Sequence, residues 1–112
     1  MPWIAKHRFA RISPRKARLL ADLIRGRDVQ DALNILKFTP NRAAGMISKV
    51  LTSAVANANE DEANVESLYV LEATVGEGPT MKRFHPKDRG RAHPIMKRTS
   101  HITVAVEEEE EV

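Results

Sequence analysis

The sequence predicts an α+β domain that carries a long basic arm, and three observations support this fold class. Three segments in the first half of the chain repeat apolar residues at helical spacing. Two segments in the second half alternate apolar and polar residues, as strands do. Between these two segments, residues 78–99 are rich in Lys and Arg and are interrupted by Pro and Gly. A chain of 112 residues has the usual size of a single domain.

The first predicted helix follows an extended basic strand that ends at Ile12. Ser13 is a favourable N-cap residue, and Pro14 suits the first helical position because the N–H that it lacks would have no partner there. We expect Gly26 to end the helix in the left-handed conformation. The expected buried stripe consists of Ala17, Leu20, Ala21 and Ile24, widened by Leu19 and Leu23.

Two more helices are predicted before residue 60. Asp28 can cap a short helix, whose apolar face is formed by Val29, Ala32, Leu33 and Leu36. Thr39 and Pro40 repeat the pattern of a capping residue before proline, and we expect them to open a longer third helix. Its buried positions keep helical spacing for about four turns: Ala43, Ile47, Val50, Ala54 and Ala58. The polar residues 59–64 then form a turn.

From Leu68 the apolar period changes to that of a strand. One face of this strand is expected to consist of Tyr69, Leu71, Ala73 and Val75. A second alternating segment near the end of the chain contains Ile102, Val104 and Val106.

Residues 77–99, which we call the arm, are expected to form two extended limbs that meet near residues 87–91. At the rise of a strand, the limb from Glu77 to Gly90 can reach about 40 Å, whereas a 100-residue domain has a radius of gyration of about 13 Å. An isolated hairpin is marginally stable, and like charges on facing limbs repel each other. We therefore expect an external polyanion to hold the arm, and nucleic acid phosphate is suited to this.

Charge is segregated along the chain. Residues 1–27 have a net charge of +7, residues 28–77 of −5, residues 78–101 of +6 and residues 102–112 of −5. Such segregation is expected when some surfaces face a polyanion and others face water. We therefore expect one nucleic-acid-binding domain over residues 1–106, for which the resemblance described below implies RNA, and an acidic tail over residues 107–112.

The composition excludes several classes of protein. The chain has no Cys, so it can form neither a disulfide framework nor a thiolate metal site. No apolar run has the length of a membrane span or a signal-peptide core. We expect a soluble intracellular protein that needs no cofactor and no metal.

Several short motifs resemble those of a known family. In the first half of the chain they are residues 13–18, 22–26, 53–54 and 56–58; in the second half they are residues 77–79, 81–83, 90–92 and 97–104. In this order, from about Ile4 to Val106, they resemble the large-subunit ribosomal protein L-twenty-two family of bacterial type. The segment from Lys97 to Val104 is the most specific of them.

The resemblance implies three helices packed on a three-stranded antiparallel sheet, with a long extended β-hairpin. It implies a structural, non-enzymatic role in the cytoplasmic ribosome. The implied partners are large-subunit ribosomal RNA, neighbouring large-subunit ribosomal proteins and the nascent peptide, because in this family the hairpin lines part of the exit tunnel. No membrane is implied, and we expect the free protein to be a monomer.

The residues expected to contact RNA fall into two groups. The N-terminal group, chosen by charge, comprises Lys6, Arg8, Arg11, Arg15, Lys16, Arg18, Arg25 and Arg27. The arm group comprises Met81, Lys82, Arg83, His85, Arg89, Arg91, His93, Lys97, Arg98, Thr99, Ser100 and His101. The tunnel-lining tip implied by the resemblance consists of Lys87, Asp88, Arg89, Gly90, Arg91 and Ala92, with Lys87-Asp88 where the family usually has Arg-Ala.

Three other hypotheses remain open from the residues alone. The arm could be a charged surface loop without a partner. The chain could be an architectural DNA-binding protein with basic β-arms, which would require a dimer and apolar wedges at the arm tips. An enzyme would use His7, His85, His93 or His101, but the sequence offers these residues no obvious carboxylate partner except Asp88.

Overall fold

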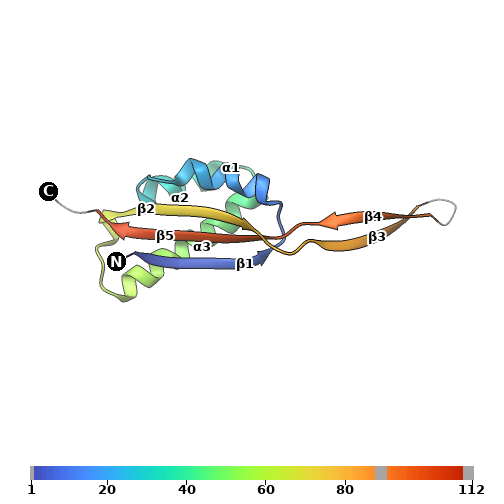
Figure 1. Cartoon of the computed structure of the whole chain (residues 1–112). Coiled ribbons are helices and arrows are strands. Elements are labelled where there is room, and N and C mark those ends of the chain that lie inside the picture. Colours follow the sequence, from blue (N-terminus) through green and yellow to red (C-terminus); the bar gives the residue numbers. More distant parts are fainter. Residues whose placement is uncertain (1, 88–90, 110–112) are drawn as a thin grey trace.

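Three helices cover one face of a three-stranded antiparallel sheet, and a two-stranded ribbon extends from one end of that sheet (Figure 1). The computed structural model describes residues 2–87 and 91–109, and for residues 81–87 and 91–97 it describes the backbone only. The sheet has the order β1 (Trp3–Ala10), β5 (Ser100–Glu108), β2 (Leu68–Glu77). The ribbon pairs β3 (Met81–Lys87) with β4 (Arg91–Lys97). The predicted fold class and its long hairpin are confirmed.

The helices are α1 (Pro14–Ile24), α2 (Val29–Phe38) and α3 (Arg42–Glu60), and a single 3-10 turn, η1 (Val65–Ser67), leads into β2. α3 packs across β1 and β5, α1 packs against β2, and α2 contacts both other helices. The buried residues of α3 include every position that the sequence predicted for its inner face. Many of them are alanines, whose small side chains let the helix approach the sheet closely.

Two leucines of α1 do not join its buried stripe. The four predicted stripe residues are buried, but Leu19 is 67% exposed and Leu23 is 47% exposed. At about 100° per residue, these two positions lie more than about 100° around the helix from the centre of the stripe. The prediction that Leu19 and Leu23 widen the buried face was therefore wrong.

The helix ends follow the predicted positions in part. Gly26 has a φ of +82° just after α1, as expected, and its N–H donates to the Val70 carbonyl at 2.8 Å. Ser13 and Asp28 occupy the N-cap positions of α1 and α2, but neither side chain accepts a capping hydrogen bond. The glycine turn thus directs the chain after α1 against β2.

The start of α3 was predicted two residues too early. The Thr39 hydroxyl donates to the Ile35 carbonyl at 2.7 Å, so Thr39 ends α2. Asn41 is the N-cap of α3, and its side-chain oxygen accepts a hydrogen bond from the Ala43 N–H at 3.2 Å. Thr and Asn are both good capping residues, and here the nearer of the two to the helix makes the bond.

A β-bulge changes which residues of β2 face the core. Val70 pairs with Val106 and Glu72 pairs with Ala105, so Leu71 is an extra residue between them. The extra residue shifts the alternation by one position. As a result Leu68 and Val70 are buried, whereas Tyr69 is half-buried and Leu71 is 40% exposed. The predicted inner face was right for Ala73 and Val75 and wrong for Tyr69 and Leu71.

The arm makes the molecule strongly elongated. The whole molecule measures 68 × 24 × 19 Å along its principal axes. Its radius of gyration is 17.1 Å, compared with about 13 Å for a compact domain of this length. β2 and β5 lead into β3 and β4 at one end of the sheet, while both chain termini lie at the other end (Figure 1). The helical body and the arm are therefore arranged end to end.

We expect Asn41→Ala to destabilise the domain by about 1 kcal/mol, because α3 loses the side-chain acceptor of its first turn. Asp28→Ala should cost less, since Asp28 makes no capping hydrogen bond. Urea unfolding of both variants measures the difference. Equal losses for the two variants would contradict the assignment of Asn41 as the working cap.

Candidate nucleic-acid interface

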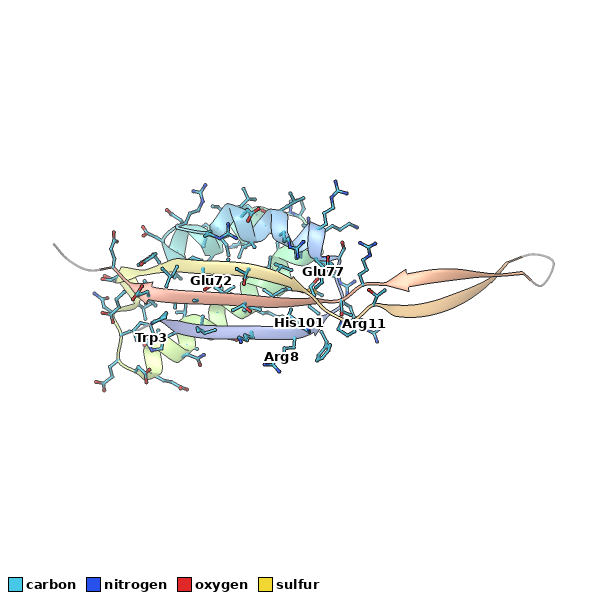
Figure 2. The ribbon with its side chains drawn as sticks, in the orientation of Figure 1. Trp3, Arg8, Arg11, Glu72, Glu77 and His101 are labelled. Carbon is cyan, nitrogen blue, oxygen red and sulfur yellow. The ribbon has the colours of Figure 1, made fainter. Side chains whose placement is uncertain are left out.

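The sheet face that the helices leave open is basic near the arm. Along β1, Trp3 and Ala5 pack against the core, whereas Lys6 and Arg8 alternate with them and are exposed. Figure 2 shows Arg8, Arg11 and His101 at the end of the sheet nearest the arm, and Trp3 at the opposite end. The strand alternation thus places two cations on the open face, and the loop after β1 adds Arg11.

Five predicted RNA contacts have exposed side chains that are available to a ligand. Within the described part of the chain, none of these five makes a side-chain hydrogen bond or an ion pair: Lys6, Arg8, Arg11, Arg15 and Lys16. Arg15 and Lys16 lie in the first turn of α1, where the helix dipole disfavours positive charge. Nothing in the described fold compensates these cations, so a phosphate-bearing partner would be favourable there.

Three other predicted contacts are used by the fold itself. The Arg18 Nε donates to the Val75 carbonyl at 3.0 Å, and Arg25 donates to the Ala73 carbonyl from Nη2 while pairing with Asp22 at 2.9 Å. The Arg27 Nε donates to the Leu23 carbonyl at 2.7 Å. Because β2 is an edge strand, its outward carbonyls need partners, and Arg18 and Arg25 supply them from α1. These side chains fasten the helix to the sheet.

The base of the arm is held by buried hydroxyl groups. The Thr99 hydroxyl donates to the Pro79 carbonyl at 2.7 Å, and the Ser100 hydroxyl donates to the Ile12 carbonyl at 2.6 Å. Gly78 donates its N–H to the Thr99 carbonyl at 2.9 Å, and a Cβ at this position would overlap the Thr99 Oγ1. These contacts tie both limbs of the arm to each other and to the segment before α1.

This geometry gives Thr99 and Ser100 a different role from the one predicted. Both were expected to contact phosphate, yet Thr99 is 3% exposed and Ser100 is fully buried, and both hydroxyls already donate within the chain. Their side chains therefore serve the fold.

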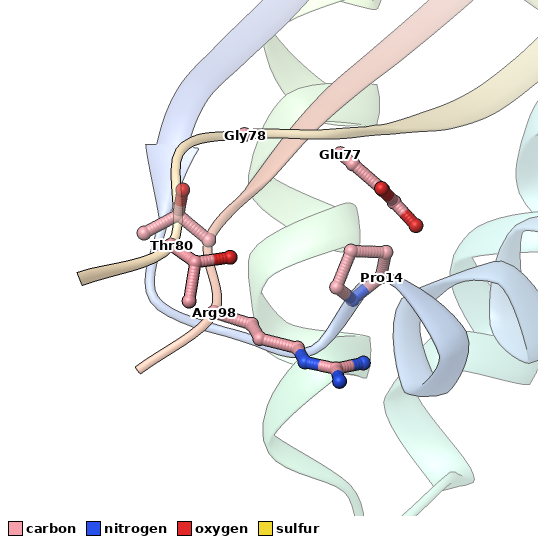
Figure 3. A pocket seen from close by; sticks show the side chains of 6 residues that line it. Pro14, Glu77, Gly78, Thr80 and Arg98 are labelled. Atoms are coloured by element: carbon pink, nitrogen blue, oxygen red, sulfur yellow. The ribbon is translucent and has the colours of Figure 1, made fainter. Parts of the chain in front are cut away.

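A cleft opens beside this junction. It is lined by Pro14, Glu77, Gly78, Thr80, Arg98 and Thr99. Figure 3 shows the Arg98 side chain running beneath Pro14, with Glu77 on the far side of the proline. The cleft lies where the start of α1, with Arg15 and Lys16, comes close to the arm.

His101 contacts an aromatic residue that the sequence analysis did not select. Its Nδ1 accepts a hydrogen bond from the Phe9 N–H at 3.1 Å, and the two rings meet edge to face at 4.9 Å. The signal for Phe9 was an aromatic residue between Arg8 and Arg11.

The register of the ribbon separates most of its charges. Met81 pairs with Lys97, Lys82 with Met96, Arg83 with Ile95, His85 with His93, and Lys87 with Arg91. Among the described pairs, two basic residues are register partners only at Lys87–Arg91, fewer than the sequence suggested. The pairing also places His85 opposite His93.

The same register divides the ribbon into two kinds of rows. Alternate rows belong to the same face of a ribbon. Four alternate rows each hold a basic residue or a histidine pair: Met81–Lys97, Arg83–Ile95, His85–His93 and Lys87–Arg91. The rows between them are mainly apolar, with Lys82 as the basic exception. Basic residues thus belong mainly to one face of the arm.

Half of the predicted tip, Asp88, Arg89 and Gly90, lies outside the described residues. Of the other half, Lys87 is the last residue of β3, and Arg91 and Ala92 are the first two of β4. The side chains of the arm group from Met81 to Lys97 also lie outside the description, so their contacts with RNA stay a prediction.

Acidic residues collect at the end of the molecule opposite the arm. A shallow depression there is lined by Gly26, Asp28, Tyr69, Glu107, Glu108 and Glu109. The Glu107 carboxylate accepts a hydrogen bond from the Tyr69 hydroxyl at 3.2 Å, and Glu108 accepts one from the Asn64 N–H at 3.0 Å. The segregation of charge along the sequence thus places acidic residues at one end of the molecule and basic residues toward the other.

Over residues 2–87 and 91–109, no group of three or more His, Asp or Glu side chains is arranged to hold a metal ion. No helix in the described ranges combines the length and apolar character needed to cross a bilayer.

Comparison with known proteins gives a consistent result. The family model described as ribosomal protein L22p/L17e matches residues 5–107. The large ribosomal subunit protein uL22 of Thermoanaerobacter sp. (strain X514) is 57% identical over 104 residues, which cover 92% of this chain and 94% of that protein. The protein of the same name from Thermoanaerobacter pseudethanolicus (strain ATCC 33223 / 39E) matches with the same identity and coverage.

We expect Ser100→Ala to destabilise the body by about 1–3 kcal/mol, because the Ile12 carbonyl loses its buried donor. Ser53→Ala is the matched control, since Ser53 is exposed on α3 and its side chain makes no hydrogen bond in the described part of the chain. Chemical denaturation monitored by circular dichroism checks both variants. A Ser100→Ala protein as stable as the control would contradict a structural role for this hydroxyl.

Proposed function

Because the chain belongs to the ribosomal protein L22p/L17e family, we propose that it is a structural component of the large ribosomal subunit and that it binds large-subunit ribosomal RNA. This is a family of structural ribosomal proteins and not of enzymes, and its members work in the cytoplasmic ribosome. The observation that carries RNA binding is the set of five uncompensated cations on β1, on the loop that follows it and at the start of α1.

The proposed RNA surface has three parts. Lys6, Arg8 and Arg11 belong to the open sheet face and the loop that follows β1, and Arg15 and Lys16 belong to the start of α1. Arg98 joins these groups beside the cleft at the base of the arm. The arm then continues the cationic surface away from the body. Phosphates that follow this path would meet a cation on the sheet, on the helix and along the ribbon.

The acidic end supports one orientation of the protein. Glu107 to Glu109 and Asp28 line one depression, at the end of the sheet opposite the arm. Phosphate would repel that end and attract the other, so the arm and its base would enter the RNA while the acidic end stays outside. Neighbouring ribosomal proteins are the natural partners of the remaining body surface.

We further propose that the arm lines the nascent-peptide exit tunnel, with residues 87–92 nearest the growing chain. The length of the molecule supports this, because a compact domain could not reach inward from a surface position. One mainly basic face of the ribbon would contact RNA, and the more apolar face would be left to other surroundings. In solution, without the ribosome, we expect a monomer.

Binding to large-subunit RNA should weaken steeply with salt. If about eight phosphates are neutralised, a plot of log affinity against log salt concentration has a slope of about −6 to −7. Filter binding over a range of KCl concentrations measures this slope. Arg8→Gln should reduce its magnitude by about 0.7–0.9, the value of one phosphate contact.

Arg18→Gln is the matched control for that experiment. Arg18 is basic and exposed like Arg8, but its Nε donates to the Val75 carbonyl. We expect Arg18→Gln to lower stability by about 1 kcal/mol and to change the salt slope less than Arg8→Gln does. A flat salt response of the unmodified protein would contradict RNA binding through phosphates.

The arm should be separable from the body. Replacing residues 81–97 by an Asn-Gly turn removes β3 and β4 but leaves the buried core and the junction from Gly78 to Ser100 in place. We expect native-like circular dichroism from the helices, cooperative unfolding, and weaker RNA binding with a reduced salt slope. Collapse of the helical body in this variant would show that the division into body and arm is wrong.

A further inference from the structure

Phe9 is an exposed aromatic residue in a strained backbone conformation. It is 59% exposed although it lies in the sheet, near the end of β1. Its φ is +57°, in the left-handed region that L-residues other than Asn and Asp rarely adopt. The register of β1 against β5 is irregular between His7 and Ala10, so a bulge turns Phe9 outward.

Few interactions within the fold stabilise Phe9 in this conformation. The ring is not part of the core or of the residues that pack against it. Within the described residues its contacts are the edge-to-face approach of His101 at 4.9 Å and the hydrogen bond from its N–H to His101 Nδ1. Strained residues of this kind persist where they serve a function.

His101 holds the Phe9 ring in a fixed orientation. His101 follows Ser100, which is fully buried and bonded to the Ile12 carbonyl, so the backbone beside the imidazole is anchored. The imidazole then fixes both the ring and the N–H of Phe9. An aromatic surface is therefore prepared in advance at the base of the arm, and a ligand need not order it.

The surroundings indicate what would cover this ring. Arg8 precedes Phe9 and Arg11 follows two residues later, and both are exposed cations without a partner among the described residues. Figure 2 shows Arg8, Arg11 and His101 at the same end of the sheet. An apolar protein surface could cover the ring but would leave two guanidinium groups buried without a counter-charge. A nucleotide presents a flat base and a phosphate together, and so meets both requirements.

We propose that Phe9 is a stacking platform for one unpaired base of the RNA, with Arg8 and Arg11 holding the phosphates on either side of that base. This inference rests on the proposed RNA binding and adds a specific contact to it. It identifies the local RNA structure as a bulge or loop nucleotide, because a base inside a helix cannot expose its face to a side chain.

Two substitutions of Phe9 separate stacking from bulk. Phe9→Leu keeps an apolar side chain at the same backbone strain but removes the aromatic face, and Phe9→Tyr keeps that face. With in vitro transcribed large-subunit ribosomal RNA, we expect Phe9→Leu to weaken binding about tenfold or more and Phe9→Tyr to stay within about twofold of the native chain. The salt slope should be unchanged in both, because no phosphate contact is lost.

A third variant guards against a loss caused by misfolding. Phe9→Asn tolerates the left-handed backbone, so it should melt no lower than the native chain and still lose affinity as Phe9→Leu does. Chemical probing of the RNA gives a second measurement. One unpaired nucleotide should be protected by the native chain and by Phe9→Tyr, and become reactive with Phe9→Leu.

The outcomes distinguish this inference from the proposed function. If Phe9→Leu binds and protects the RNA as the native chain does, while Arg8→Gln lowers the salt slope, the stacking contact is refuted and RNA binding stands. If the native chain itself shows no salt-dependent binding, the proposed function fails and the stacking contact fails with it.

Discussion

The junction at the base of the arm, where the limbs leave the sheet, is the constraint on which the rest of this structure depends. The pairing of β2 with β5 ends at Glu77 and Ser100, and the pairing of β3 with β4 starts at Met81 and Lys97, so three residues on one limb face two on the other. The limbs are held together at this mismatch by the hydrogen bonds of the Thr99 and Ser100 hydroxyls and by the close approach of Gly78 to Thr99. Since Thr99 and Ser100 are buried, the direction of the ribbon is set by contacts inside the domain. A long two-stranded ribbon has little core of its own, and its direction has to be set at its root.

The arginines of the N-terminal region serve two different purposes. α1 lies against the edge strand β2, whose outward carbonyls would otherwise face water or another strand, and Arg18 and Arg25 donate to two of them. Arg27 donates to the Leu23 carbonyl, whereas five other cations of the region make no side-chain hydrogen bond or ion pair among the described residues: Lys6, Arg8, Arg11, Arg15 and Lys16. A basic segment is thus in part a fastening of the fold and in part a surface for a polyanion. The net charge of +7 over residues 1–27 overstates the interface by the cations that the fold already uses.

The sequence predicted the elements of this fold better than their edges. Helical spacing identified α1, α2 and α3 because their buried alanines, leucines and isoleucines repeat over several turns. Helical spacing did not predict where a helix begins, because one residue can decide this. Thr39 and Asn41 are both residue types that cap helices, and only the geometry of the chain shows that Asn41 is the cap of α3. Strand alternation likewise assumes that no residue is inserted, and the bulge at Leu71 reverses the assignment of everything before it.

The candidate site was predictable to the same extent and for related reasons. Composition locates positive charge, so Lys6, Arg8 and Arg11 could be selected, but it does not show which hydroxyls are buried, and Thr99 and Ser100 were misjudged. Phe9 escaped selection because its conformation depends on a second bulge, between His7 and Ala10. Both bulges do the same thing: an irregular pairing turns an apolar side chain out of the sheet. Leu71 lies on a strand whose own sequence has no Lys or Arg, whereas Phe9 has Arg8 and Arg11 close to it in the sequence. The charge beside an exposed apolar residue, and not its exposure alone, therefore distinguishes a surface prepared for nucleic acid from a consequence of strand pairing.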